Sequence, residues 1–235
     1  MFETKTGIFL IAGLLFFLLS VLVMAVVPWT IYMDQHEMTA MELAEAGIVP
    51  EFVELAERFP ERFATHFPGG VTAASYAEAL ELGRRVYVGE ACWHCHSQQV
   101  RPVSKEELRW GPVSRAEEYQ NVLQRPVLFG PRGVGPDLSR EGGRKSNDWH
   151  LAHFYKPVSV VPTSVMPEYP WFFDDDGYPN KRGMAIITYV QWLGSWLDVY
   201  PYYNGEDGSD ASPSVTPFET ATTQAPKSSW NADDG

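Results

Sequence analysis

The two cysteines of the chain stand together in Cys92-Trp93-His94-Cys95-His96. This C-x-x-C-H spacing is the attachment signature of haem c, because two thiols three positions apart can add to the two vinyl groups of one porphyrin. The histidine that follows is then held beside the iron as an axial ligand. The sequence therefore predicts one covalently attached haem c, with Cys92 and Cys95 as the anchors and His96 as an iron ligand.

Two other kinds of site also use a C-x-x-C pair. A dithiol oxidoreductase places the pair in a βαβ unit and lowers the pKa of one thiol. A structural zinc normally needs four ligands, and with no second cysteine pair His94 and His96 would complete the set only in cramped geometry. The helical pattern before the motif and a possible second iron ligand after it favour haem over both alternatives.

The second axial ligand must come from elsewhere in the chain. Met166 is one of seven methionines and lies in the segment S-V-M-P-E-Y-P, whose prolines would hold a weak thioether bond in place. We therefore expect Met166 opposite His96, with His150 or His153 as the alternative of a bis-histidine site. Methionine–histidine ligation raises the reduction potential relative to two histidines, which suits an electron carrier.

A third element, Gly135-Pro136-Asp137-Leu138, follows the haem motif. The carbonyl of Pro136 can accept a hydrogen bond from the outer ring nitrogen of His96, although a plain turn is the usual role of a Gly-Pro pair. The order C-x-x-C-H, G-P-x-L, M-P is that of class I cytochromes c, and it predicts a haem domain of that class. Buried haem propionates need polar partners, for which there are six candidates: Arg101, Arg132, Arg144, Trp149, His150 and His153.

The chain also contains an apolar segment that could anchor this domain in a membrane. Gly7 to Val27 contains no charged residue and would form a helix about 32 Å long, enough to cross a bilayer once. A cleaved signal peptide would have a shorter apolar core and a small-x-small cleavage site. Gly183 to Tyr200 is a second apolar stretch, but it is short and contains Gln191 and Asp198, so we expect a helix of the haem domain there.

We divide the chain into five parts: residues 1–6 in the cytoplasm, an anchor helix over 7–27 that can extend to about 33, an acidic helical linker over 34–75, the haem domain over 76–200, and an acidic, disordered tail over 201–235. Within the domain, one helix near Tyr76 to Gly89 should pack against the helix at Gly183 to Tyr200, with Gly83 allowing close approach of the two backbones. The predicted fold class is mainly α.

Charge sets limits on location and partners. The net charge of −12 argues against binding to nucleic acid or to anionic lipid headgroups. Lys5 is the only basic residue before the anchor, so the positive-inside signal is weak. Because haem c is attached outside the bacterial cytoplasmic membrane, we expect a single-pass protein of that membrane with a cytoplasmic N-terminus and a periplasmic haem domain.

These motifs together resemble one family. The segments E-x-C-W-H-C-H-S-Q-x-V-R-P (90–102), G-P-D-L (135–138), W-H-x-x-H (149–153) and S-V-V-P-x-S-V-M-P-x-Y-P-W (159–171) are similar to the mono-haem subunit, subunit II, of cbb3-type (C-family) haem–copper cytochrome c oxidases. The resemblance covers about residues 80–200 and the anchor. It implies that Cys92 and Cys95 bind haem and that His96 and Met166 ligate its iron.

The resemblance also implies partners. Such a subunit is bound to a large polytopic haem–copper subunit that reduces oxygen to water, and it receives electrons from a di-haem cytochrome c subunit or a soluble cytochrome c. The chain itself has no histidine set on membrane helices that could hold copper, so we expect an electron carrier without catalytic residues of its own. The segment 34–75 and the tail look longer than in the family. They leave open a haem c subunit of a nitric oxide reductase or a free-standing anchored shuttle.

Overall fold

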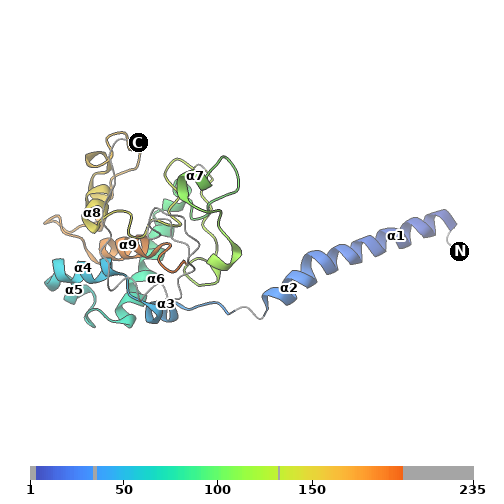
Figure 1. Ribbon diagram of the computed structural model, residues 1–235, viewed down its shortest axis with the longest axis horizontal. Coiled ribbons are helices and arrows are strands. Elements are labelled where there is room, and N and C mark those ends of the chain that lie inside the picture. The colour runs from blue at the N-terminus through green and yellow to red at the C-terminus, as the bar shows by residue number, and fades with distance from the viewer. Residues whose placement is uncertain (1–3, 34–35, 132, 198–235) are drawn as a thin grey trace, which may run out of the picture. The chain divides into compact units, whose positions relative to one another are not determined.

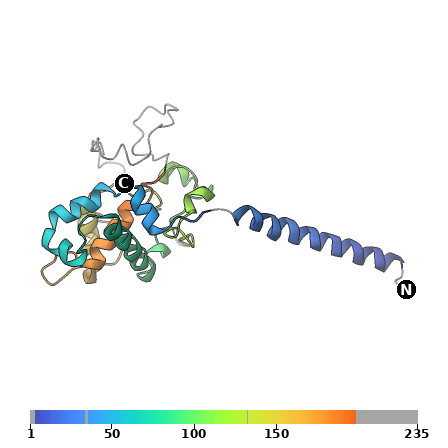
Figure 2. The ribbon, with the colours of Figure 1, turned by 90° about the horizontal axis from the view of Figure 1, so that it is seen from below.

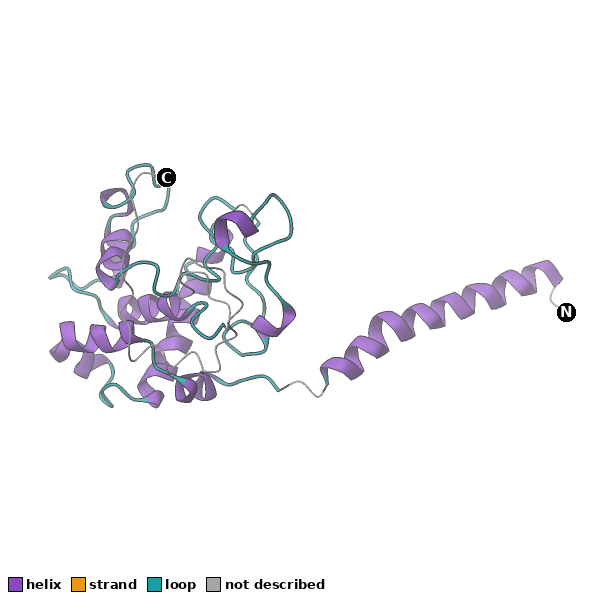
Figure 3. Ribbon diagram, in the orientation of Figure 1, coloured by secondary structure: helices purple, strands orange, loops and turns teal. Residues whose placement is uncertain are grey.

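The computed structural model describes residues 4–33, 36–131 and 133–197, in two compact units that separate between Glu37 and Met38. Within the described residues the regular elements are helices (Figure 3). Two isolated β-bridges are the only strand-like pairings among these residues. The prediction of a mainly helical protein is confirmed. The predicted tail over 201–235, the candidate Arg132 and the last residues of the predicted helix at 183–200 lie outside the described residues.

The first unit is one apolar helix. α1 (Thr4–Val21) continues through a π-helical turn, η1 (Leu22–Val26), into α2 (Val27–Tyr32). Pro28 cannot donate a hydrogen bond and its ring crowds the carbonyl four residues earlier, which accounts for the wider turn just before it. The segment Lys5–Tyr32 is long and apolar enough to cross a membrane, with a mean hydropathy of 3.0. It fits the predicted single-pass anchor.

The second unit is built around two helices, α6 (Ala73–Gly89) and α9 (Lys181–Trp192), which lie side by side in Figures 1 and 2. The predicted inner face of α6 is buried as expected, with Tyr76 and Leu80 fully inaccessible to solvent. Gly83 faces the backbone carbonyl of Ala185 and lies where a Cβ would stand 2.5 Å from the Cβ of Tyr189. The close approach predicted at Gly83 is therefore present.

α9 is a helix of the folded domain. Every residue from Gly183 to Trp192 is buried within the unit, whereas a membrane span would face lipid. The helix ends earlier than the apolar pattern suggests, because Leu193 leaves the helical conformation and Gly194 takes a positive φ of 88°. Glycine reaches this left-handed conformation without the steric cost that other residues meet, and it commonly terminates helices.

Three short helices precede α6: α3 (Ala40–Ala46), α4 (Pro50–Arg58) and α5 (Pro60–His66). α3 packs on α6, and α4 packs on α9. Phe52 of α4 is fully buried, with its ring centroid 5.1 Å from that of Phe63 and 5.0 Å from that of Tyr76. Residues 38–66 fall within the linker predicted over 34–75, and they contribute to the same hydrophobic core as α6 and α9.

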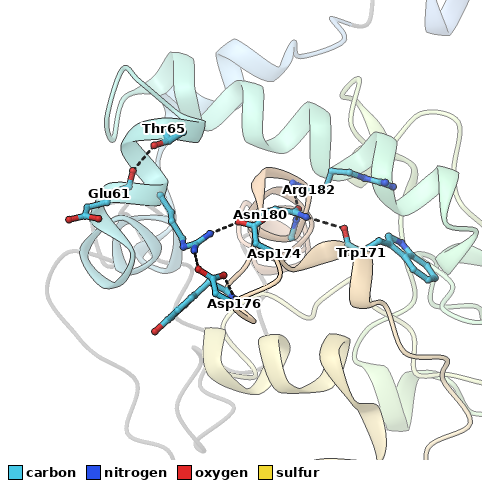
Figure 4. A network of polar contacts seen from close by, with 10 residues as sticks. Glu61, Thr65, Trp171, Asp174, Asp176, Asn180 and Arg182 are labelled. Atoms are coloured by element: carbon cyan, nitrogen blue, oxygen red, sulfur yellow. Dashed lines mark hydrogen bonds and ion pairs between the residues drawn. The ribbon is translucent and has the colours of Figure 1, made fainter.

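The rest of the unit is short helices and loops: η2 (Cys92–His94), α7 (Glu107–Trp110), η3 (Ala116–Tyr119), α8 (Asn147–Tyr155), η4 (Pro157–Ser159) and η5 (Pro170–Phe172). Polar contacts join the segment between η5 and α9 to α5 and to the start of α9 (Figure 4). Arg62 of α5 forms ion pairs with Asp174 and Asp176, and the Asn180 side chain caps α9 while donating to the carbonyl of Trp171 at 3.0 Å.

Candidate haem site

The C-x-x-C-H segment forms one tight turn directly after α6. Ala91 takes a left-handed conformation, with φ of 58°, and reverses the chain into η2. The backbone N–H of His96 then donates to the carbonyl of Cys92 at 2.9 Å, and that of Cys95 donates to the same carbonyl at 3.2 Å. Both cysteines are free thiols in this turn, and the turn presents them together with His96.

The environment of Cys92 differs from that of a redox-active dithiol. Burial, together with the nearby Glu90 carboxylate, raises the pKa of its thiol to about 12. A reactive thiolate needs the opposite, an electropositive and accessible setting that lowers the pKa. Nor do the described residues contain a group of three or more His, Cys, Asp or Glu side chains arranged to hold a metal such as zinc.

The His96 ring is fixed from several sides. Its Nδ1 lies 3.0 Å from the carbonyl oxygen of Pro136, so Nδ1 carries the proton and donates. The hydroxyl of Tyr87 donates to the His96 carbonyl at 2.6 Å, and the N–H of Gly135 donates to the carbonyl of Cys95 at 3.0 Å. This arrangement leaves the Nε2 lone pair of His96 available, which is the tautomer that an iron ligand requires. The donor set therefore fits a haem.

Gly135 is required for this geometry. A Cβ at this position would lie 2.6 Å from Nδ1 and 2.7 Å from Nε2 of His96, far inside van der Waals contact. The G-P pair thus combines a close approach of backbone to imidazole with the acceptor carbonyl. Asp137 holds the same loop, because its carboxylate accepts from the N–H of Gln99 at 3.0 Å and from the N–H of Ser139 at 2.8 Å.

A buried polar network behind the C-x-x-C-H turn (Cys92–His96, the haem turn) was not predicted. Gln98 is 1 % exposed; its carbonyl accepts from the hydroxyl of Tyr119 at 2.8 Å, and its side-chain oxygen accepts from that of Tyr189 at 3.1 Å. These contacts attach the segment after His96 to η3 and α9. The S-Q-x-V-R-P motif could have indicated this network, because a polar glutamine next to a buried turn needs hydrogen-bond partners.

Met166 lies in the loop that follows α8. Its side chain is half-buried against the hydrophobic core, and its N–H donates to the hydroxyl of Ser164 at 3.2 Å. The loop closes where the N–H of Tyr169 donates to the carbonyl of Phe154 at 2.9 Å. The described residues show no contact between the Met166 sulfur and His96. The assignment of Met166 as an iron ligand stays a prediction, which rests on the position of its loop in the chain.

The candidate propionate partners fall into two groups. Arg101 forms an ion pair with Glu106, and Arg144 forms one with Glu141 at 3.2 Å, so both guanidinium groups already bind carboxylates of the chain. Arg132 is not described.

The second group is the aromatic cluster of α8. The Trp149 and His153 rings stack with centroids 4.5 Å apart and planes at 14°. Burial lowers the pKa of His150 to about 3 and that of His153 to about 4, so both imidazoles are neutral at pH 7. The Nε2 of His150 and the Nδ1 of His153 are buried without a hydrogen-bond partner among the described residues. A bound polar or metal-containing group could supply the partner that these two ring nitrogens lack.

Comparison with known proteins agrees with this geometry. The chain matches the family model described as cytochrome c oxidase, mono-haem subunit (FixO), over residues 53–194. The matched region runs from α4 to the turn after α9 and contains the C-x-x-C-H turn, the Gly135–Leu138 loop and Met166. A search of curated proteins found no match.

Proposed function

The chain belongs to the family of mono-haem subunits of cytochrome c oxidase (FixO), the subunit of cbb3-type oxidases, and we propose that it relays single electrons to the oxygen-reducing subunit of that complex. Membership makes it a haem subunit of an oxidase assembly with a separate catalytic subunit. When bound, the haem supplies reversible one-electron transfer. The chain's residues would attach that group and hold the ligands of its iron in place.

The observation that carries the proposal is the imidazole of His96, whose Nδ1 is held 3.0 Å from the Pro136 carbonyl on the turn that also presents Cys92 and Cys95. In this arrangement the two thiols would hold the haem by thioether bonds and Nε2 of His96 would ligate the iron. Met166, on its proline-flanked loop, would supply the second ligand. The high potential of such a pair suits delivery of electrons to an oxygen-reducing centre.

We place the protein in the bacterial cytoplasmic membrane, with its N-terminus in the cytoplasm and its haem domain in the periplasm. The apolar helix Lys5–Tyr32 supports a single-pass anchor. Its neighbours would be a large polytopic haem–copper subunit as electron acceptor and a di-haem cytochrome c subunit or a soluble cytochrome c as donor. The burial of Phe52 in the domain core speaks against residues 50–58 serving as a loose tether of a free-standing shuttle.

The test is purification of the full chain from its native membrane in mild detergent. We expect one covalently bound haem per chain, detected by its pyridine haemochrome spectrum after acid–acetone extraction, and co-elution with a polytopic subunit in a complex that consumes oxygen. The Cys92→Ala/Cys95→Ala variant is the matched control and should lose the covalent haem. Recovery of a lone cytochrome without a polytopic partner would reject the oxidase role, and a complex that reduces nitric oxide instead of oxygen would reassign the acceptor.

A further inference from the structure

His153 and Met166 lie on two chain segments that one hydrogen bond, between Phe154 and Tyr169, joins into a closed loop. His153 is in the last turn of α8, directly before Phe154, and Met166 lies three residues before Tyr169. The N–H of Tyr169 donates to the carbonyl of Phe154 at 2.9 Å, and the two aromatic rings meet edge to face with centroids 6.1 Å apart. The hydrogen bond therefore brings the chain segments that carry His153 and Met166 to the same place.

The closed end of this loop lies near the haem turn. At the closed end of the loop, Tyr169 stacks on Phe172 with ring centroids 5.2 Å apart. The guanidinium of Arg182 lies over the Phe172 ring, 5.8 Å from its centroid, and forms an ion pair with Glu90, two residues before the C-x-x-C-H segment. The imidazole of His153 also lies close enough to that of His96 for their charges to interact. Two imidazoles from distant parts of the chain, one on the haem turn and one on α8, thus border the same region as the loop of Met166.

His153 is held in position but is chemically unused. Its ring stacks on Trp149 with centroids 4.5 Å apart, which restricts the orientation of the imidazole. Its Nδ1 is buried without a hydrogen-bond partner among the described residues, and a buried polar atom in that state is rare in folded proteins. His150 differs, because it is buried at 4 % exposure, whereas His153 is half-buried.

We propose that His153 is a reserve axial ligand, which binds the haem iron when the sulfur of Met166 leaves it. The inference rests on the proposed function, since it requires the haem and the His96–Met166 ligand pair. In the exchange the Met166 sulfur would keep the electron pair of its bond to the iron, and a lone pair of the His153 imidazole would take its place. No proton or redox equivalent is transferred. Two imidazole ligands would lower the reduction potential, so the chain would accept electrons from its donor with less driving force.

The experiment uses the full haem-loaded chain carrying Met166→Ala, in the ferric state, studied by optical absorption and electron paramagnetic resonance. We expect loss of the thioether–iron charge-transfer band together with a six-coordinate low-spin spectrum typical of two imidazole ligands. The double variant Met166→Ala/His153→Phe should become high-spin, and phenylalanine keeps the aromatic stack on Trp149. Met166→Ala/His150→Phe is the matched control and should stay low-spin.

Each outcome decides the proposal. A high-spin Met166→Ala protein that binds added imidazole has an open iron that His153 does not reach, and this result overturns the inference while leaving the ligand pair intact. A low-spin spectrum that survives in Met166→Ala/His153→Phe overturns it as well, because another group is then the ligand. Absence of covalent haem, or a charge-transfer band that persists in Met166→Ala, instead overturns the proposed function on which the inference rests.

Discussion

The Nδ1 of His96 lies 3.0 Å from the carbonyl oxygen of Pro136, and the glycine before that proline faces the same imidazole ring. The two features depend on each other, because the carbonyl can approach the ring only if the preceding residue has no side chain. One dipeptide therefore fixes the tautomer of His96, its orientation and its distance from the Gly135–Leu138 loop.

Gly135→Ala should displace the His96 ring. Its Cβ would lie 2.6 Å from Nδ1, so the imidazole or the loop must move, at a cost of about 1–3 kcal/mol. We expect a lower yield of haem-loaded protein and a raised reduction potential, measured by redox titration, because a weaker hydrogen bond to Pro136 makes the imidazole a less basic ligand. Gly69→Ala is the control, because the nearest atom to its Cβ is the Thr72 hydroxyl oxygen at 3.5 Å. Equal potentials for Gly135→Ala and the wild type would contradict this role.

Tyr87→Phe should loosen the haem turn from α6. The variant removes the 2.6 Å hydrogen bond to the His96 carbonyl and leaves that acceptor without this donor in a partly buried setting, at a cost of about 1–3 kcal/mol. Urea unfolding followed by circular dichroism measures the loss. Tyr155→Phe removes a hydroxyl from a tyrosine that is 53 % exposed and should change the free energy of unfolding by less than about 0.5 kcal/mol. Similar losses in both variants would argue against a specific contact.

Gly83→Val should separate α6 from α9. A Cβ at this position already meets the carbonyl of Ala185 and the Cβ of Tyr189. Neither atom can move away by a side-chain rotation, because one belongs to the backbone of α9 and the other is bonded directly to it. We expect a loss of about 3 kcal/mol or more, or failure to fold, because overpacking here separates the two central helices. Gly89→Ala, with open space around its Cβ, should be neutral or slightly stabilising. Thermal unfolding separates the two results.

Local sequence signals identified the parts of this molecule whose partners are close along the chain. The C-x-x-C-H turn, the helix before it and its inner face from Tyr76 to Tyr87 follow from spacing alone, because each depends on residues within one or two turns. The pairing of Gly83 with α9 was also predictable, since an isolated glycine on a buried helical face usually marks a close approach.

The segment over 38–66 shows why the rest could not be predicted. Its apolar spacing indicated amphipathic helices, but the residues that cover them are distant in sequence. The side-chain amide of Asn147 donates to the carbonyl of Glu51 and to the carboxylate of Glu54, both at 2.9 Å, and Phe52 packs on Tyr76. Nothing in the local composition distinguishes a helix that packs on its own domain from one that awaits a partner.

Arg62→Ala tests how firmly α5 is attached to the turn before α9. The variant removes two ion pairs, to Asp174 and Asp176, and the side chains involved are partly exposed to solvent (Figure 4). Exposed pairs contribute little, so we expect a loss of about 1 kcal/mol that shrinks at high salt. Arg85→Ala removes only the more exposed pair with Glu81, at 3.7 Å, and should be nearly neutral. A loss independent of salt would assign the effect to packing.

Glu141 should make stability depend on pH. Burial raises the pKa of its carboxyl to about 7, and the Arg144 guanidinium only partly offsets this. Because the folded state holds this proton more tightly than the unfolded state, the contribution of Glu141 to stability is fully present below about pH 4 and is lost as the pH rises to 7, by up to about 3 kcal/mol. Glu141→Gln should flatten that part of the profile and make the protein relatively more stable at pH 8 than at pH 5, compared with the wild type. Urea titrations at the two pH values measure both slopes, and an unchanged slope in Glu141→Gln would assign the pH dependence to other groups.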